Sequence, residues 1–493
     1  MKSTHDRLQP ENEAKKQPLS RKNMSSHFFF APRESKQESH FHPIPKLMTL
    51  DTLANKFKEI LGDKTLNNVA VIAVQHNLET TVSLYRSIKA LGVRKIFTLG
   101  KCYSDSPEIV KVLEVEKDVY LLPSTKPCRP GDYHKVVQRD VDNLWRFCLK
   151  EIKDQDIDTI IILDDGGRCL IGTPAIVPHR YKMAGIEQTR GRLYHKELDR
   201  LPFSIVDVAT SALKKYIEAP FIAKAVISTV DKVLRSYQLT QQNAVVGIIG
   251  KGVIGTALTQ HLLSLKYMVN VYDEEEDAYV AGVTRMETIQ GLVARSNCIF
   301  SCTGKDISQD ITLADHVAQD TIFISCSSED KEFHSELKKI AKKAKNIIEI
   351  DPLKSFTTYS NTDSHSRMIF VNGGYPVNFN KSPWNVPQHE IEPTQAALFS
   401  AVIQGVFLAK RVVADGVTIS KNERVMLLPE MQRFIVEMWQ DEEAAKQFNK
   451  ELLAHFKETS WIQKNSGGAH QEIPTMAEYF YPSTKVSHIR SAL

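Results

Sequence analysis

Short apolar runs alternate with longer segments of helical periodicity from Leu47 onward. The runs of the first half that predict buried strands are Val69–Val74, Lys95–Leu99, Asp118–Leu122, Thr159–Leu163 and residues 203–208. Strands that alternate with helices at this spacing predict a parallel sheet covered by helices on both faces. Ligands of such sheets bind beyond the carboxyl ends of the strands, which is where His76, Cys102 and Asp164 fall.

A second series of apolar runs follows a helical stretch at Thr210–Tyr237. Its members are Ala244–Ile249, Met268–Tyr272, Cys298–Cys302, Thr321–Ser325, Asn346–Ile350 and Met368–Asn372. These runs predict a second parallel sheet, so the expected fold class is α/β with two doubly wound sheets. Beyond them, Pro393–Val413 predicts a long apolar helix, and Glu423–Glu442 is an amphipathic segment.

The strongest motif is Gly250–Gly255 (GKGVIG), which stands between an apolar run and a helical pattern. Gly250 permits a tight turn, Gly252 lets the backbone approach a pyrophosphate, and Gly255 lets the helix pack on the strand. Asp273 ends the next apolar run, where an acid binds the ribose of NAD and disfavours NADP. The motif predicts a Rossmann-type NAD site, and a glycine turn that has lost its ligand is the alternative.

Composition and charge narrow the class of protein. The 493 residues are 42% hydrophobic and 25% charged, with a net charge of +4, which favours neither a nucleic-acid partner nor a membrane surface. A chain of this length is expected to form more than one domain. Its N-terminus lacks the apolar core of a signal peptide, and its seven cysteines are scattered as reduced thiols are. We therefore expect a cytoplasmic protein without a metal site.

Both ends of the chain are polar. Residues 1–45 have too few apolar side chains to offset the entropy of ordering, which predicts a disordered tail. Phe28–Phe30 stands alone in that tail, either as an unused apolar patch or as a contact for a partner. Residues 464–493 are expected to form a flexible C-terminal tail.

With these residues in view, the chain resembles the S-adenosylhomocysteine hydrolase (adenosylhomocysteinase) family. The resemblance rests on ILDDGG (Ile162–Gly167), the glycine motif with its acid, Cys302–Gly304 and Val371–Gly373. It implies a Rossmann-type NAD domain inserted into a second doubly wound parallel substrate domain. The implied ranges are residues 46–222 for the first part of the substrate domain, 223–384 for the NAD domain, and 385–463 for helices that return to the substrate domain.

The family's chemistry assigns roles to particular residues. A tightly held NAD oxidises a ribose hydroxyl, homocysteine is eliminated, water adds, and the ketone is reduced again. The resemblance implies that proton transfer belongs to Lys214, Glu218, Asp164, Asp165 and His76. It implies that an adenosine-type substrate is bound by Glu79, Gln188 and Thr189. The cofactor would be bound by Gly250, Gly252, Val253, Ile254, Gly255, Asp273, Thr303, Gly304 and Asn372.

Most of the proton-transfer set departs from the family pattern, including three positions near the expected substrate site. Glu218 stands where the family has the Asp after its catalytic Lys, Ala219 replaces an Asn, and Gln188 replaces a carboxylate. Lys214 and Glu218 also have the spacing of a solvated ion pair on a helix. His76 has a structural alternative as well, since a histidine after a buried strand can serve as a cap or a hydrogen-bonded core residue.

Two cofactor assignments have similar alternatives. Thr303–Gly304 follows an apolar run and is also the pattern of an ordinary tight turn. Asn372 is expected to hydrogen-bond the nicotinamide amide, but a turn-forming asparagine explains it nearly as well.

These observations leave two main hypotheses for function. The first is an NAD-binding homologue of adenosylhomocysteinase that acts on S-adenosylhomocysteine or a related nucleoside by oxidation, elimination and reduction. The second is a catalytically silent NAD-binding or nucleoside-binding regulator. A dehydrogenase that releases NADH is disfavoured, because no His/Arg pair for a carboxylate substrate is evident. The family resemblance also implies a homo-oligomer, to which the long helix Pro393–Val413 and the spaced tyrosines Tyr479 and Tyr481 are candidates to contribute.

Overall fold

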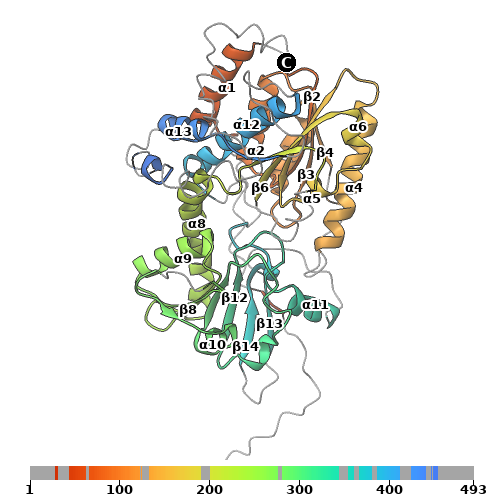
Figure 1. The fold of residues 1–493 in the computed structure, drawn as a ribbon. Coiled ribbons are helices and arrows are strands. Elements are labelled where there is room, and N and C mark those ends of the chain that lie inside the picture. The colour runs from red at the N-terminus through yellow and green to blue at the C-terminus, as the bar shows by residue number, and fades with distance from the viewer. Residues whose placement is uncertain are drawn as a thin grey trace, which may run out of the picture.

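The computed structural model has two lobes, each built around one twisted sheet (Figure 1). The described residues are 28–30, 44–62, 66–122, 124, 133–189, 200–275, 280–343, 354–359, 366–379, 386–410, 423–439, 446 and 448–452. The red-to-yellow first part of the chain, apart from residues 28–30, shares the upper lobe with the blue last part, and the green and teal middle forms the lower lobe. We call these the first domain and the Rossmann domain.

The sheet of the first domain is entirely parallel, with strand order β15-β7-β6-β5-β2-β3-β4. Its strands in chain order are β2 (Val69–Gln75), β3 (Lys95–Gly100), β4 (Val119–Leu122), β5 (Thr159–Asp165), β6 (Lys182–Thr189), β7 (Ser204–Asp207) and β15 (Arg424–Met426). The central strands are buried along their whole length, which explains why they are continuous apolar runs instead of alternating patterns.

Helices cover both faces of this sheet (Figure 1). One face packs against α1 (Met48–Leu61), α2 (Glu79–Ala90), α12 (Gln388–Lys410) and α13 (Pro429–Met438), and the other packs against α4 (Tyr133–Ile152). Shorter helices of this domain are α3 (Pro107–Val115), α5 (Arg168–Ile171) and α6 (Val177–Arg180). The helix α12 has the length and composition of a membrane span, but 89% of its apolar window is buried inside the protein. The last part of the described chain thus completes the core that the first part begins.

The Rossmann domain has strand order β10-β9-β8-β11-β12-β14 for its parallel part, the 3-2-1-4-5-6 order of dinucleotide-binding sheets. Its elements are β8 (Val245–Ile249), α9 (Val253–Ser264), β9 (Met268–Tyr272), β10 (Thr284–Arg285), α10 (Ile289–Arg295), β11 (Cys298–Ser301), β12 (Thr321–Ser325), α11 (His334–Lys343) and β14 (Arg367–Phe370). A π-helical turn, η2 (Leu213–Glu218), and then α8 (Ala219–Ser236) connect the two domains. The fold class expected from the sequence is therefore confirmed.

Several elements differ from the expectation. Phe28–Phe30 forms β1, which pairs antiparallel with β13 (Lys354–Tyr359) at the open edge of the Rossmann sheet, so the N-terminal segment is not unstructured throughout. An open strand edge can pair with any extended segment, and phenylalanine suits that geometry. The amphipathic segment Glu423–Glu442 contains a strand, Arg424–Met426, as well as the helix α13, because β7 offers that strand a parallel edge. The expected strand Asn346–Ile350 lies outside the described residues.

The cysteines also differ in part from the expectation. Cys102 is disulfide-bonded, which corrects the interpretation of all seven as reduced thiols. Five other described cysteines are free: Cys148, Cys169, Cys298, Cys302 and Cys326. Linear spacing cannot reveal a pair that only the folded chain brings together.

Candidate functional site

The glycine loop between β8 and α9 has the geometry that its sequence implies. Gly250 has φ +93°, and a Cβ there would lie 3.0–3.1 Å from backbone atoms of Cys302 and Thr303. A Cβ on Gly255 would lie 1.9 Å from the carbonyl oxygen of Gly250. No atom of the described residues lies within 4 Å of a Cβ built on Gly252, so its backbone is open on that side. Gly250 and Gly255 are therefore required by close backbone contacts within the fold. Gly252 leaves room for a phosphate at the start of α9.

Asp273 follows β9 directly and is tied to this loop. Its Oδ2 accepts a hydrogen bond from the Lys251 amide at 2.5 Å, and its Oδ1 accepts one from the Glu275 amide at 2.9 Å. These contacts orient the carboxylate beside the glycine loop, at the position of a ribose-binding acid.

The turn after β11 lies against the glycine loop and is fixed by a buried carboxylate, Glu332. Its oxygens accept hydrogen bonds from Ser301 Oγ at 2.6 Å, Thr303 Oγ1 at 2.7 Å and the Gly304 amide at 2.7 Å. The Ser327 hydroxyl also donates to it. Burial raises the pKa of Glu332. Thr303 and Gly304 are therefore held in one conformation by a residue that the sequence did not single out.

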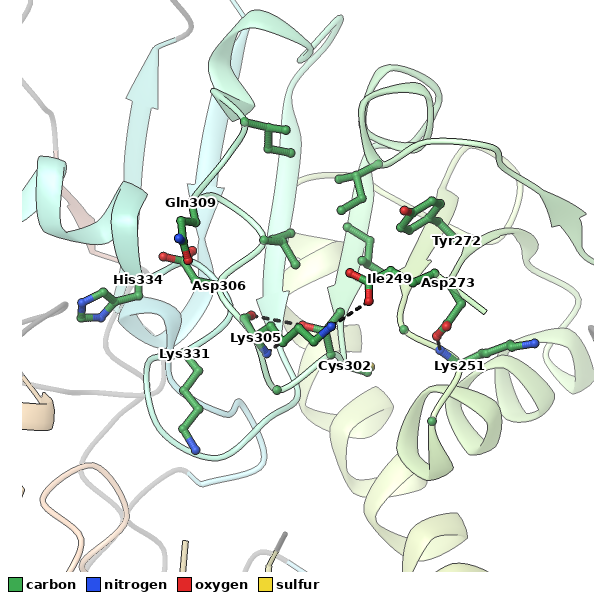
Figure 2. Close-up of a pocket in the computed structure, with 18 of the residues that line it drawn as sticks. Ile249, Lys251, Tyr272, Asp273, Cys302, Lys305, Asp306, Gln309, Lys331 and His334 are labelled. Carbon is green, nitrogen blue, oxygen red and sulfur yellow. Dashed lines mark hydrogen bonds and ion pairs between the residues drawn. The ribbon is translucent and has the colours of Figure 1, made fainter. Parts of the chain in front are cut away.

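These loops line one cavity of about 1050 Å³ (Figure 2), which we call the cofactor cavity. Figure 2 shows Lys251 and Asp273 at one side of it, and Lys331 and His334 at the other. The expected residues among its lining are Gly250, Gly252, Asp273, Thr303 and Gly304. Its volume, its glycine cradle and its acid together fit a dinucleotide.

Four expected cofactor residues do not line this cavity. Val253, Ile254 and Gly255 are the first residues of α9, and none of them belongs to its wall. Asn372 is buried with φ +50°, and its Nδ2 donates to the Pro376 carbonyl at 3.0 Å. These are the contacts of a turn-forming asparagine, the alternative considered for this position.

The first domain contributes His76, Lys101, Asp164 and Asp165, which we call the charged cluster. His76 Nε2 lies 3.0 Å from Asp165 Oδ2, and Lys101 Nζ lies 3.2 Å from Asp165 Oδ1. The other ring nitrogen of His76, Nδ1, lies 2.6 Å from Ser104 Oγ. All four side chains are almost completely buried at the carboxyl ends of β2, β3 and β5. The fold therefore assembles residues from three sequence stretches at the edge where ligands of parallel sheets bind.

Burial sets the protonation of this cluster. It lowers the pKa of His76 to about 4, with help from the charge of Lys101, so the imidazole is neutral near pH 7. Burial alone would raise the pKa of Asp165, but Lys101 and the hydrogen bond from His76 hold it well below its usual value. Burial raises the pKa of Asp164 to about 6. Two adjacent carboxyl groups thus differ in proton affinity, which is a condition for acid–base work.

The remaining expected substrate residues lie around the cluster. Asp164 Oδ2 accepts a hydrogen bond from the Leu170 amide at 2.9 Å, which fixes the start of α5, and the Thr189 side chain hydrogen-bonds Asp165. Glu79 is held from α12, because Gln388 Nε2 donates to its Oε1 at 2.6 Å. Gln188 is 9% exposed, and its Oε1 has no hydrogen-bond partner among the described residues.

Lys214 and Glu218 form an ion pair within the π-helical turn η2. Their side chains are only 16% and 13% exposed, so the pair is not the solvated one that their spacing also allowed. The charge of Lys214 contributes to the lowered pKa of His76, which places the ammonium group within electrostatic reach of the cluster. A π-helical turn is rare and is found frequently at functional sites.

The Rossmann domain covers the charged cluster. The Phe379 ring stacks on the His76 imidazole with centroids 3.8 Å apart, and Tyr375 stacks on Tyr103 at 4.9 Å. Arg168, just after the DDGG turn, forms a buried ion pair with Glu329 of the Rossmann domain. The cofactor cavity includes none of the four cluster residues in its lining. The two regions are thus adjacent but separated by the protein's own side chains.

Sequence reasoning missed several residues of this interface. Lys101 and Ser104 follow β3, a position that could have marked them, but nothing in a lone lysine or serine identifies its partner. His134 Nδ1 lies 2.5 Å from Arg168 Nη1, and both residues line the cofactor cavity. The fold thus creates a His/Arg pair that the sequence did not suggest.

The Rossmann domain is similar in sequence to a known family of NAD-binding domains. Residues 245–351 match a sequence family described as the NAD binding domain of 6-phosphogluconate dehydrogenase. Two uncharacterised proteins of Mycobacterium tuberculosis, from two strains, are 26% identical to this chain over 336 residues, or 65% of it. The chain spans 61% of the length of these curated relatives.

Solved structures with a similar arrangement are distant. An NADPH-dependent glyoxylate/hydroxypyruvate reductase from Sinorhizobium meliloti is 9% identical, with a TM-score of 0.34 over 68% of this chain and 92% of that one. A dipicolinate synthase chain from Bacillus halodurans is 12% identical, with a TM-score of 0.33 over 57% of this chain and 88% of that one. Such values carry no argument about the reaction. The family match and the loop geometry agree on a narrower conclusion: this chain contains a Rossmann-type NAD-binding domain, and NAD is its cofactor.

Proposed function

We propose that this protein retains NAD and acts with it on S-adenosylhomocysteine or a related nucleoside bound at the charged cluster. The observation that carries the proposal is the cluster itself, a set of buried ionisable groups at the carboxyl edge of the first sheet, facing the NAD-binding domain. Gln75 Nε2, Asp164 Oδ1 and Gln188 Oε1 are buried there without hydrogen-bond partners among the described residues. Unpaired buried polar atoms at this edge of a sheet support a polar ligand.

In this proposal, separate residues transfer protons and orient the ligand. When bound, NAD supplies the means to oxidise a ribose hydroxyl and to reduce the ketone later. Lys214 is the group that we assign to proton transfer at that hydroxyl, with Glu218 as its ion-pair partner. Asp164, which has a raised pKa, is suited to exchange a proton near neutral pH. Asp165 and Thr189 orient the ligand through the hydrogen-bond network of His76 and Lys101.

A catalytically silent NAD- and nucleoside-binding protein is the second candidate, and specific contacts favour it. Both nitrogens of His76 are engaged by Ser104 and Asp165, and Phe379 covers the ring. Lys214 is paired with Glu218, so neither His76 nor Lys214 can engage a ligand without giving up an existing contact. The structure gives less support to a hydroxy-acid dehydrogenase. Such an enzyme needs an arginine to bind the substrate carboxylate, and the guanidinium of Arg168 is already bound by Glu329.

One experiment separates the two candidates. The purified protein is assayed for bound NAD, then mixed with adenosine or S-adenosylhomocysteine while the absorbance of the reduced cofactor is followed. The proposal expects a rise in that absorbance followed by decay as the cycle closes. Bound NAD with no spectral change for either compound would favour the silent binder.

A further inference from the structure

The two domains are joined by a buried ion pair between Arg168 and Glu329. Arg168 is the first residue of α5, directly after the DDGG turn, and Glu329 follows β12 of the Rossmann sheet. Arg168 Nε donates to Glu329 Oε1 at 2.9 Å, and Nη2 donates to Oε2 at 2.6 Å. The two side chains are 5% and 2% exposed. The contact is therefore a bidentate pair with two parallel hydrogen bonds, the geometry in which such pairs are strongest.

The surroundings of Glu329 are built to hold its carboxylate in place. Gly166 brings the DDGG turn close to it, because a Cβ there would lie 3.3 Å from Glu329 Oε1. The Glu329 amide donates to the hydroxyl of Tyr103 at 3.4 Å, and Lys331 Nζ lies 3.6 Å from its carboxylate. Burial opposes ionisation, but Lys331 and Arg168 lower the pKa of Glu329, which keeps it charged.

The backbone of Glu329 is strained in this position. Its φ is +70°, in the left-handed region that residues with a Cβ rarely adopt. Such a conformation persists only where the surrounding contacts determine it, and it occurs preferentially at functional sites.

The pair also forms part of the wall of the cofactor cavity. Arg168 and His134 of the first domain line the cavity together with Glu329 and Lys331 of the Rossmann domain. Both domains contribute side chains to this part of the wall, so moving the domains apart here separates Arg168 from Glu329. Separating a buried pair leaves two charges without their partner, which is costly.

We propose that Arg168 and Glu329 are positioning residues that clamp the two domains over bound NAD and thereby set its rate of release. The clamp requires that the cavity hold NAD, and it does not depend on any reaction at the charged cluster. Among the described residues of the first domain, Arg168 and His134 are the ones that line the cavity, so the clamp acts where the two domains meet at its wall.

The test compares Glu329→Gln with a matched control, Asp320→Asn. Asp320 also binds an arginine through two nitrogens, Arg367, but that pair is exposed and lies within the Rossmann domain. Each full-length protein is loaded with NADH and mixed with excess NAD, and the loss of NADH fluorescence gives the release rate. Glu329→Gln is expected to release NADH roughly tenfold faster or more, and Asp320→Asn at the wild-type rate. Small-angle scattering should show a larger radius of gyration for Glu329→Gln alone.

Arg168→Lys provides a second variant that keeps the charge and loses the bidentate geometry. It should release NADH at a rate between those of the wild type and Glu329→Gln. Unchanged release in both folded clamp variants would overturn the proposal, and so would a wild-type protein that binds no NADH. Failure of adenosine to reduce the bound cofactor would leave the clamp intact, so the two proposals fail separately.

Discussion

The cofactor cavity and the charged cluster lie at equivalent places of two parallel sheets, yet they differ in what forms them. The part of the cavity that would receive the pyrophosphate is shaped by backbone, at the glycine loop and the tight turn Thr303–Gly304. The cluster is formed by side chains from separate strands, and Phe379 and Glu329 of the other domain close over it. The glycine loop depends on local backbone geometry and is therefore fixed by one stretch of sequence. A site that depends on side chains is fixed only when distant segments pack.

Lys214→Ala tests whether the covered cluster is catalytic, and it has the largest expected effect. Removing a group that transfers a proton should lower the rate of cofactor reduction by adenosine by roughly 10²–10⁴-fold, with NADH affinity unchanged. Stopped-flow absorbance measures the rate. Lys224→Ala is the control, since Lys224 is 61% exposed and pairs with Glu390 away from the cluster. A full rate in Lys214→Ala would refute the role assigned to this lysine.

His76→Gln tests the burial of the charged cluster through the pH dependence of the free energy of unfolding. With a pKa of about 4 in the folded state and an ordinary value near 6.5, His76 binds a proton less readily in the folded than in the unfolded protein. Its contribution to stability is therefore complete above about pH 6.5 and is lost as the pH falls towards 4, by about 3 kcal/mol.

Chemical denaturation at several pH values measures this contribution. The difference between wild type and His76→Gln isolates it from Asp164, whose raised pKa acts in the opposite direction. His179→Gln, at an exposed histidine, should leave the pH dependence as it is. A parallel pH dependence in wild type and His76→Gln would mean that His76 titrates as if it were exposed.

Two glycine substitutions test the backbone character of the cofactor cavity. Gly252→Ala places a methyl group in open space at the start of α9, so it should weaken NADH binding by about 1.5–3 kcal/mol and leave stability unchanged. Gly255→Ala forces a methyl group against the Gly250 carbonyl and should destabilise the fold by about 1–3 kcal/mol as well. NADH titration and thermal unfolding distinguish the two. Equal stability losses would contradict the different roles assigned to these glycines.

Asp273→Ser has the smallest expected effect, and it tests whether this carboxylate determines the preference for NAD over NADP. The carboxylate disfavours the additional phosphate of NADP, so its removal should shift the ratio of NAD to NADP affinity by about tenfold towards NADP. Asp273 also accepts hydrogen bonds from two backbone amides, and serine keeps only part of that bonding. Titration with both nucleotides measures the ratio, and an unchanged ratio would assign Asp273 to loop structure alone.

Most of the regular structure could be predicted because parallel strands are buried on both faces. The run Thr321–Ser325 is a strand with the expected bounds, and Val69–Val74 and Lys95–Leu99 differ from theirs by one residue. The strand Lys182–Thr189 was not expected, since Gly185 and the polar residues Glu187–Thr189 interrupt its apolar pattern. Burial of Glu187 is tolerated because Arg424, far along the chain, pairs with it.

The sequence alone determined the alternation of strands and helices, the Rossmann topology and the cofactor loop, because each of these follows from local periodicity and from glycine stereochemistry. It also pointed to His76, Asp164 and Asp165 as residues at strand ends. Only the tertiary structure decided that Lys101 neutralises Asp165, that Lys214 and Glu218 are partly buried, and that Arg168 meets Glu329 across the domains. Those contacts join residues up to 161 positions apart. Their electrostatics depend on burial, and burial is a property of the packed chain.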